Sequence, residues 1–200
     1  MNPSAIISAR VKQVLVFVAL LCACFLSMAS KAQSIGQQQQ PNNKPWEELV
    51  STEGRFTVLM PGTPEEHFLP VPGQVVNTEV HAFLVKSEVA TYAVLYGDLT
   101  DEAKDPDLLK TVFDSGRDRI LATGSVRLVS EKDISSGKTM GREWVIDDGA
   151  QVIKSRVFCR GGRLYQMIFV GPEVSGMSTE LVKFYDGLTS KFFGSFKINT

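Results

Sequence analysis

The chain has 200 residues, with 21 lysines and arginines against 22 aspartates and glutamates and a formal charge of −1. This length suits one domain with a sizeable core, and the balanced charge lacks the basic excess of a nucleic-acid-binding protein. We therefore exclude nucleic acid as a partner. The sequence also lacks the polybasic cluster that would hold it on an anionic membrane.

The first 32 residues have the layout of a secretory signal peptide. Arg10 and Lys12 precede an apolar run from Val14 to Leu26, and Ser30 and Ala32 place small residues at the −3 and −1 positions of a cleavage site. This run of 13 residues is shorter than the about 20 residues of a membrane-spanning helix. We predict a signal peptide over residues 1–32, a periplasmic or secreted location, and no stable membrane span in the mature form.

A second interpretation of this segment is a lipid anchor. Leu21 to Cys24 resembles a lipoprotein cleavage box with Cys24 as the lipidated residue, but Phe25 and Leu26 continue the apolar run where a lipoprotein tether is usually polar. We favour simple cleavage and keep lipidation of Cys24 as an alternative. Cleavage after residue 32 would leave 168 residues with a net charge of −4 and Cys159 as the one cysteine, so no intramolecular disulfide could form.

Residues 33–45, QSIGQQQQPNNKP, follow the signal peptide. A segment so poor in apolar residues cannot bury enough surface to offset the entropy lost on ordering. We predict a disordered Gln-rich tether over residues 33–45 and a single domain over residues 46–200 that begins at Trp46.

Three strands are predicted in the first half of the domain. In residues 54–60 the side chains of Phe56, Val58 and Met60 share one face by the period of two. Prolines and glycines make residues 61–73 an irregular connection, and residues 74–86 form the next strand. Residues 89–96 return as its partner, and because both of their faces are apolar, this strand should be central and covered on both sides.

A helix is predicted to begin at Asp105, an N-cap residue followed by a proline at the first helical position. Its apolar stripe at helical spacing consists of Leu109, Val112, Phe113 and Ile120. Thr123 and Gly124 should end this helix. Residues 126–133 should form the next strand.

A three-stranded meander and a second helix complete the predicted domain. The strands cover residues 140–146, 150–159 and 163–170, joined by the turn pairs Asp148-Gly149 and Gly161-Gly162. Ser178 caps the helix, Gly194 ends it, and residues 196–198 form a short strand or docked tail. The stripe that we expect to be buried is Leu181, Phe184, Leu188 and Phe192. The fold class is α+β, a mostly antiparallel sheet flanked by two helices.

Short motifs spread over this domain carry a resemblance to a known fold. They are GRFTV at residues 54–58, PGTP at 61–64, YAVLY at 92–96, GRE at 141–143 and RLY at 163–165. With the element order, they resemble a group of uncharacterised exported bacterial domains with the PsbP-like fold, an α/β/α sandwich. The fold is named for an extrinsic subunit of photosystem II and is shared with a Ran-binding nuclear import factor. The resemblance implies partner binding and carries no catalytic residue across.

The residue types that usually perform catalysis do not form a recognisable set. His67 lies beside Glu65 and Glu66 in a loop expected to be solvated, and adjacent residues rarely converge on one metal ion. His81 is expected to be a half-exposed strand residue with Glu79 on its face. Cys159 shares an apolar strand face and should be buried and unreactive. We therefore predict no catalytic residue, no bound metal and no cofactor.

One surface feature is a candidate for binding. If Arg142, Lys154 and Arg156 share a solvent-exposed face, they form a small basic patch. The alternative, which we favour, is that these cations pair across strands with Glu143 or other acids.

These observations favour an exported, non-enzymatic binding or accessory domain of the cell envelope whose partner is an unknown protein or small ligand. The alternative is a hydrolase-type enzyme or enzyme subunit, for instance one that uses carboxylates at a site the sequence does not reveal. The lipid-anchored envelope factor, through Cys24, is the third interpretation.

Overall fold

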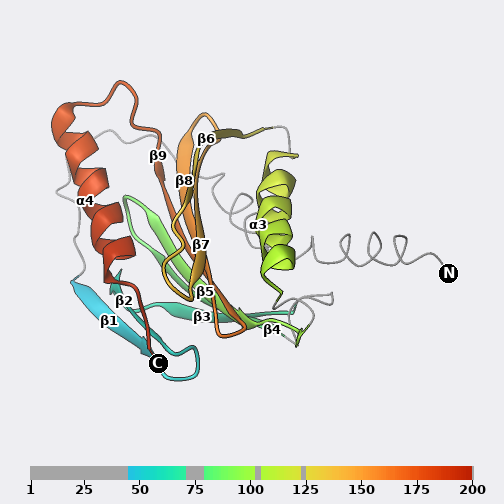
Figure 1. The fold of residues 1–200 in the computed structure, drawn as a ribbon. Coiled ribbons are helices and arrows are strands. Elements are labelled where there is room, and N and C mark those ends of the chain that lie inside the picture. Colours follow the sequence, from blue (N-terminus) through green and yellow to red (C-terminus); the bar gives the residue numbers. More distant parts are fainter. Residues whose placement is uncertain (1–44, 71–78, 102–104, 123–124, 200) are drawn as a thin grey trace.

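The computed structural model describes residues 45–70, 79–101, 105–122 and 125–199. The predicted signal peptide and the predicted tether up to residue 44 lie outside these residues. The described part contains a seven-stranded sheet, a three-stranded sheet and two helices (Figure 1).

The large sheet is antiparallel between all neighbouring strands, in the order β3-β4-β5-β9-β8-β7-β6. Its strands are β3 (Glu65–Pro70), β4 (Glu79–Lys86), β5 (Thr91–Asp98), β6 (Arg127–Asp133), β7 (Met140–Asp147), β8 (Gln151–Arg160) and β9 (Arg163–Pro172). The small sheet has the order β1-β2-β10, with β1 (Trp46–Ser51), β2 (Phe56–Pro61) and β10 (Lys197–Ile198).

The two helices lie on opposite faces of the large sheet (Figure 1). Helix α3 (Pro106–Leu121) packs on one face, and helix α4 (Thr179–Ser195) packs with the small sheet on the other. Each face has its own core of buried side chains. The predicted α+β class, an antiparallel sheet flanked by two helices, is therefore confirmed.

Strand β5 shows why both cores are needed. Tyr92, Val94 and Tyr96 enter the core on the α4 side, whereas Ala93 and Leu95 enter the core on the α3 side. All five are at most 3% exposed. The prediction that this strand is central and covered on both faces is confirmed.

The turn and cap residues act as their chemistry predicts. Gly149, Gly161 and Gly162 have positive φ angles of 88°, 60° and 77°, which residues with a Cβ adopt at a cost. The carboxylate of Asp105 accepts hydrogen bonds from the backbone N–H groups of Asp107 and Leu108 at the start of α3. The predicted end of α3 at residues 123–124 lies outside the described residues.

Two strands exist that the sequence analysis did not predict. Strand β1 pairs with β2 over its whole length, although its alternation is obscured by the exposed residues Glu47, Glu48 and Val50. Strand β3 occupies residues predicted as an irregular connection and pairs with β4. It ends at Pro70, which is tolerated because β3 is an edge strand. Residues 74–78 of the predicted strand 74–86 lie outside the described part.

The predicted stripe of α4 is correct only in its C-terminal half. Phe192 and Leu188 are buried at 0% and 9% exposure, Phe184 is partly buried, and Leu181 is 48% exposed. The helix also continues past Gly194 to Ser195. Its end is fastened to the small sheet, because the Ser195 hydroxyl accepts a hydrogen bond from the backbone N–H of Leu59 at 2.9 Å.

The burial of α4 leads to a stability prediction. We expect Phe192→Ala to lower the free energy of unfolding by about 3–5 kcal/mol, because it opens a cavity under the helix. Leu181→Ala, on the same helix but half exposed, should cost less than about 1 kcal/mol. Urea unfolding of both variants measures the difference. Equal losses would show that α4 does not rest on the sheet through its C-terminal half.

Candidate functional site

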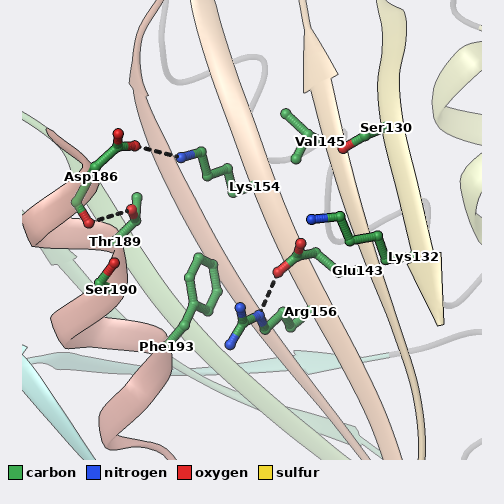
Figure 2. A pocket seen from close by; sticks show the side chains of 10 residues that line it. All are labelled: Ser130, Lys132, Glu143, Val145, Lys154, Arg156, Asp186, Thr189, Ser190 and Phe193. Carbon is green, nitrogen blue, oxygen red and sulfur yellow. Dashed lines mark hydrogen bonds and ion pairs between the residues drawn. The ribbon is translucent and has the colours of Figure 1, made fainter. Parts of the chain in front are cut away.

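A polar groove lies on the α4 side of the large sheet, between α4 and strands β6, β7 and β8 (Figure 2). Its volume is about 440 Å³. The residues that line it are Ser130, Lys132, Glu143, Val145, Lys154, Arg156, Asp186, Thr189, Ser190 and Phe193. We call it the α4 groove.

The groove forms where the strands of the sheet extend beyond the cover of α4. On β7, Trp144 and Ile146 point into the core on the α3 side, so the alternate residues Glu143 and Val145 point to the groove. Strand β8 alternates in the same way. This face of the sheet remains in contact with water, and its side chains are accordingly polar or only partly buried.

Residues directly opposite one another form a row of charges across three strands. Lys132 on β6 is paired in register with Glu143 on β7, and Glu143 is paired with Arg156 on β8. The Nε atom of Arg156 donates a hydrogen bond to Glu143 Oε2 at 2.6 Å. The Arg156 guanidinium also lies over the ring of Phe193 from α4, 4.7 Å from its centroid. Arg156 is thus held on two sides.

A second row lies two residues further along the strands. It contains Ser130, Val145 and Lys154. The Nζ atom of Lys154 reaches Asp186 Oδ1 on α4 at 3.4 Å. The neighbouring Thr189 hydroxyl donates to the backbone carbonyl of Asp186 at 3.0 Å. Helix α4 therefore contributes one carboxylate, that of Asp186, to the groove.

Lys132 differs from the other two groove cations. Within the described part of the chain its side chain forms neither a hydrogen bond nor an ion pair. Figure 2 shows its amine directed inward over β7, on the side where Lys154 and Arg156 lie. The sequence analysis did not single out Lys132.

The structure brings together two of the three residues of the predicted basic patch. Lys154 and Arg156 line the α4 groove. Arg142 lies on the opposite face of the sheet, because it is separated from Trp144 by two positions on β7 and shares its face. The predicted patch of three therefore does not form. The predicted alternative, cross-strand pairing with Glu143, describes Arg156.

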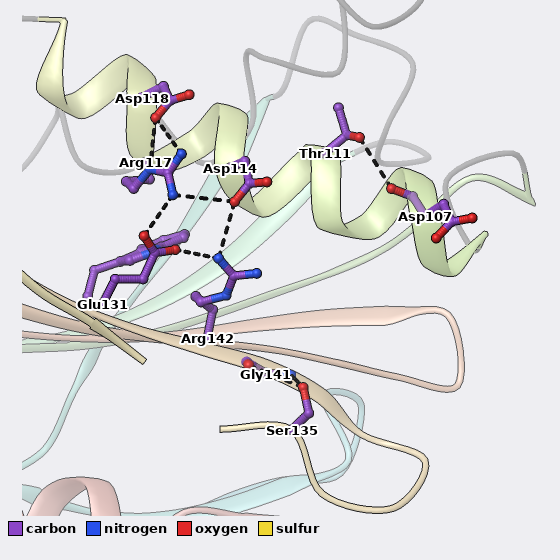
Figure 3. A network of polar contacts seen from close by, with 10 residues as sticks. Asp107, Thr111, Asp114, Arg117, Asp118, Glu131, Ser135, Gly141 and Arg142 are labelled. Atoms are coloured by element: carbon purple, nitrogen blue, oxygen red, sulfur yellow. Dashed lines mark hydrogen bonds and ion pairs between the residues drawn. The ribbon is translucent and has the colours of Figure 1, made fainter. Parts of the chain in front are cut away.

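Arg142 instead belongs to an ion network between α3 and strands β6 and β7 (Figure 3). Glu131 on β6 is its centre: it accepts hydrogen bonds from Arg142, from Arg117 on α3 at 2.7 Å, and from the indole N–H of Trp144 at 3.2 Å. Asp114 on α3 also bonds to Arg142, at 3.1 Å. Partial burial by itself would raise the pKa of Glu131, but the hydrogen bonds from Arg142, Arg117 and Trp144 outweigh it and hold the pKa below its usual value.

The two histidines are placed differently from their predictions. His67 lies on strand β3 rather than in a loop, but its side chain is 47% exposed, as the predicted solvation requires. His81, predicted to be half exposed, is buried at 9% exposure and stacks on Tyr96 with ring centroids 4.6 Å apart. Carboxylates of Glu53, Glu66 and Glu79 lie 3.6–3.9 Å from its ring nitrogens. Burial, reinforced by the Glu53 charge, raises the pKa of Tyr96 to about 12.

Cys159 is buried, and this burial raises the pKa of its thiol to about 11, which disfavours the reactive thiolate. No cluster of three or more His, Cys, Asp or Glu residues suited to a metal ion occurs within the described ranges. None of the helices that the structure describes is long and apolar enough to cross a membrane.

The arrangement of one wide antiparallel sheet between two helices is the PsbP-like fold. The solution structure of cyanobacterial PsbP, CyanoP, from Synechocystis sp. PCC 6803 is similar, with a TM-score of 0.54 and 12% sequence identity over 86% of this chain and 99% of that chain. A protein of unknown function from Pseudomonas aeruginosa, PA94, is matched at a TM-score of 0.34 and 8% identity over 72% of this chain and 94% of that chain, too low to support an argument. No protein-family model and no curated protein matches the sequence.

The ion network yields a prediction on pH. Glu131→Gln leaves Arg117 and Arg142 without their central carboxylate, so we expect a loss of about 1–3 kcal/mol at neutral pH. A carboxylate with a lowered pKa contributes stability that is complete above pH 4.5, its ordinary value, and is lost as the pH falls through its lower value in the folded protein. The difference between wild type and variant should therefore shrink in acid.

Unfolding by urea over a series of pH values measures this difference. Glu48→Gln is the matched control, since Glu48 is an exposed glutamate on β1 with no ion pair to the described residues. A Glu131→Gln variant whose deficit stays constant down to pH 3 would contradict an ionised, network-bound Glu131.

Proposed function

We propose that this protein is an exported, non-enzymatic binding or accessory domain of the cell envelope and that its binding site is the α4 groove. One observation carries the proposal: the open part of the large sheet is built into a concave polar site with cationic side chains that are only partly used by the fold. The PsbP-like fold is consistent with an accessory or binding role, although a shared fold alone does not transfer function.

The chemistry of the groove supports binding over catalysis. Its lining contains hydroxyl groups of Ser130, Thr189 and Ser190 but no histidine that could activate them. Its two carboxylates, Glu143 and Asp186, are each bonded to a cation. A hydrolase based on two carboxylates needs one that holds a proton to act as general acid, and an ion-paired carboxylate is unsuited to this role.

The export part of the proposal rests on residues 1–32. Sequencing of the mature N-terminus tests it, and we expect the exported protein to begin at Gln33. A chain that begins at a lipid-modified Cys24 would support the anchored alternative, and a full-length chain that retains Met1 in a stable membrane fraction would contradict a cleaved signal peptide.

Photo-crosslinking from two positions tests the binding part. A photoreactive residue at Ser190, exposed in the α4 groove, should form an adduct with the natural ligand or partner in cells, seen as added mass on the intact protein. The matched control is the same residue at Lys110, exposed on α3 on the other side of the sheet. Equal adducts at both positions, or none at Ser190, would contradict the groove as the binding site.

A further inference from the structure

We infer that the α4 groove binds a small anionic ligand through a carboxylate or phosphate group, held by Lys132, Lys154 and Arg156. This inference rests on the proposed function, because it names the chemistry of what the groove holds. It goes beyond that proposal in assigning the three cations a shared role as an anion site.

The positions of the three cations favour convergence on one group. Lys132 and Arg156 lie in the same cross-strand row, two strands apart, so their backbones are about 10 Å from each other. Lys154 is two residues from Arg156 on the same strand and face. Long side chains at these positions can reach a common point above β7, and Figure 2 shows the Lys132 amine directed into that space.

The hydrogen-bond donors of these cations exceed the acceptors around them. Arg156 has five N–H donors, and within the described residues only its Nε is bonded, to Glu143. The terminal nitrogens that remain are the pair that recognises a carboxylate or phosphate with two parallel hydrogen bonds. Lys154 has one acidic partner at 3.4 Å, and the Lys132 side chain forms no ion pair with a described residue, although Glu143 is its cross-strand neighbour.

The charge balance of the lining points to an anion and not to a cation. Three cations face two carboxylates, so the groove has an excess of one positive charge in a protein whose net charge is −1. Both carboxylates are already bonded, Glu143 at 2.6 Å and Asp186 at 3.4 Å. An incoming anion would meet unused donors, whereas an incoming cation would have to displace Arg156 or Lys154.

The Arg156 side chain is already held in position without a ligand, and the groove has the size of a small-molecule site. Glu143 and Phe193 hold the Arg156 guanidinium from two sides, so little side-chain entropy remains to be lost on binding. The volume of about 440 Å³ falls within the range of about 300–1,000 Å³ for small-ligand pockets. The helical wall of α4 on one side favours a compact ligand over an extended protein segment.

Calorimetric titration of the full chain with inorganic phosphate and with citrate tests the inference, at constant ionic strength with sodium chloride as the blank. We expect saturable binding of at least one of the two probes. Binding of phosphate alone identifies a phosphate ligand, binding of citrate alone a carboxylate ligand, and binding of both supports the shared chemistry.

Lys132→Gln should weaken the binding about tenfold, the loss of one charge-assisted contact. It should not affect folding, because the Lys132 side chain bonds to no described residue. The matched control is Lys138→Gln, an exposed lysine in the turn after β6 and outside the groove, which should bind like wild type. Arg156→Lys should also bind more weakly, since it keeps the charge but loses the paired donors.

The inference is overturned if neither probe binds saturably, or if Lys132→Gln binds as tightly as wild type. An adduct at Ser190 in cells without any anion binding would leave the groove as a binding site and reject only its anionic ligand. If no adduct forms at Ser190 in cells but the purified protein binds an anion saturably, the envelope partner is rejected and the anion site is retained. The two proposals therefore fail separately.

Discussion

The width of the large sheet is the constraint on which the rest of this structure depends. Seven strands about 4.8 Å apart span about 29 Å, whereas a helix with its side chains is about 10 Å across. On the α4 side, the small sheet adds cover over one half of the sheet: Phe56 of β2 contacts the rings of Phe83, Tyr96 and Tyr165 from strands β4, β5 and β9. Strands β6 and β7 lie beyond this layer, and their side chains on that face must be compatible with water.

On the α3 face, the boundary between the covered and the water-exposed part of the sheet is built from ion pairs. There the side chains of α3 and of strands β6 and β7 form a network of two arginines and three acids at the boundary between apolar core and solvent. Each arginine of this network is paired with at least two of its acids, so the charges at this boundary are balanced within the protein. The α4 face has no such closure, because its cations at the corresponding boundary are matched by too few acids. The same sheet edge is thus sealed on one face and open on the other.

Local patterns were sufficient to predict most of the fold, and non-local pairing explains the rest. Strand β5, the hairpin glycines and the cap at Asp105 were predicted because alternation, positive φ and capping act within a few residues. Strand β1 was missed because its outer residues are solvated, and it is a strand through its pairing with β2. The burial of His81 was missed because it arises from stacking on Tyr96, across the β4–β5 ladder. Leu181 fits the helical stripe, but the stripe does not reveal where the sheet beneath it ends.

The candidate site shows the same division between local and non-local signals. Lys154 and Arg156 could be placed on one face because they are two positions apart on one strand. The sequence does contain the signal that separates Arg142 from them. Arg142 alternates with Glu143 and so lies on the same face of β7 as Trp144 and Ile146, which are buried in the core on the α3 side. Lys132 joins the site only through the register of β6 against β7, which includes a shift between Leu128 and Ser130. A different register would have moved this lysine to the sealed face.

Glu143 links the stability of the groove to its binding chemistry. It lies between Lys132 and Arg156 in the cross-strand row, so its charge reduces the repulsion between two cations that the fold places close together. By bonding the Nε of Arg156 it also orients the guanidinium, so that the terminal nitrogens stay available. Glu143 neutralises Arg156 and holds it in place, and Asp186 on α4 reaches only Lys154. The remaining positive charge is therefore a consequence of the strand register. An anionic ligand would pair with the cations on this face, as Glu131 pairs with Arg117 and Arg142 on the other face.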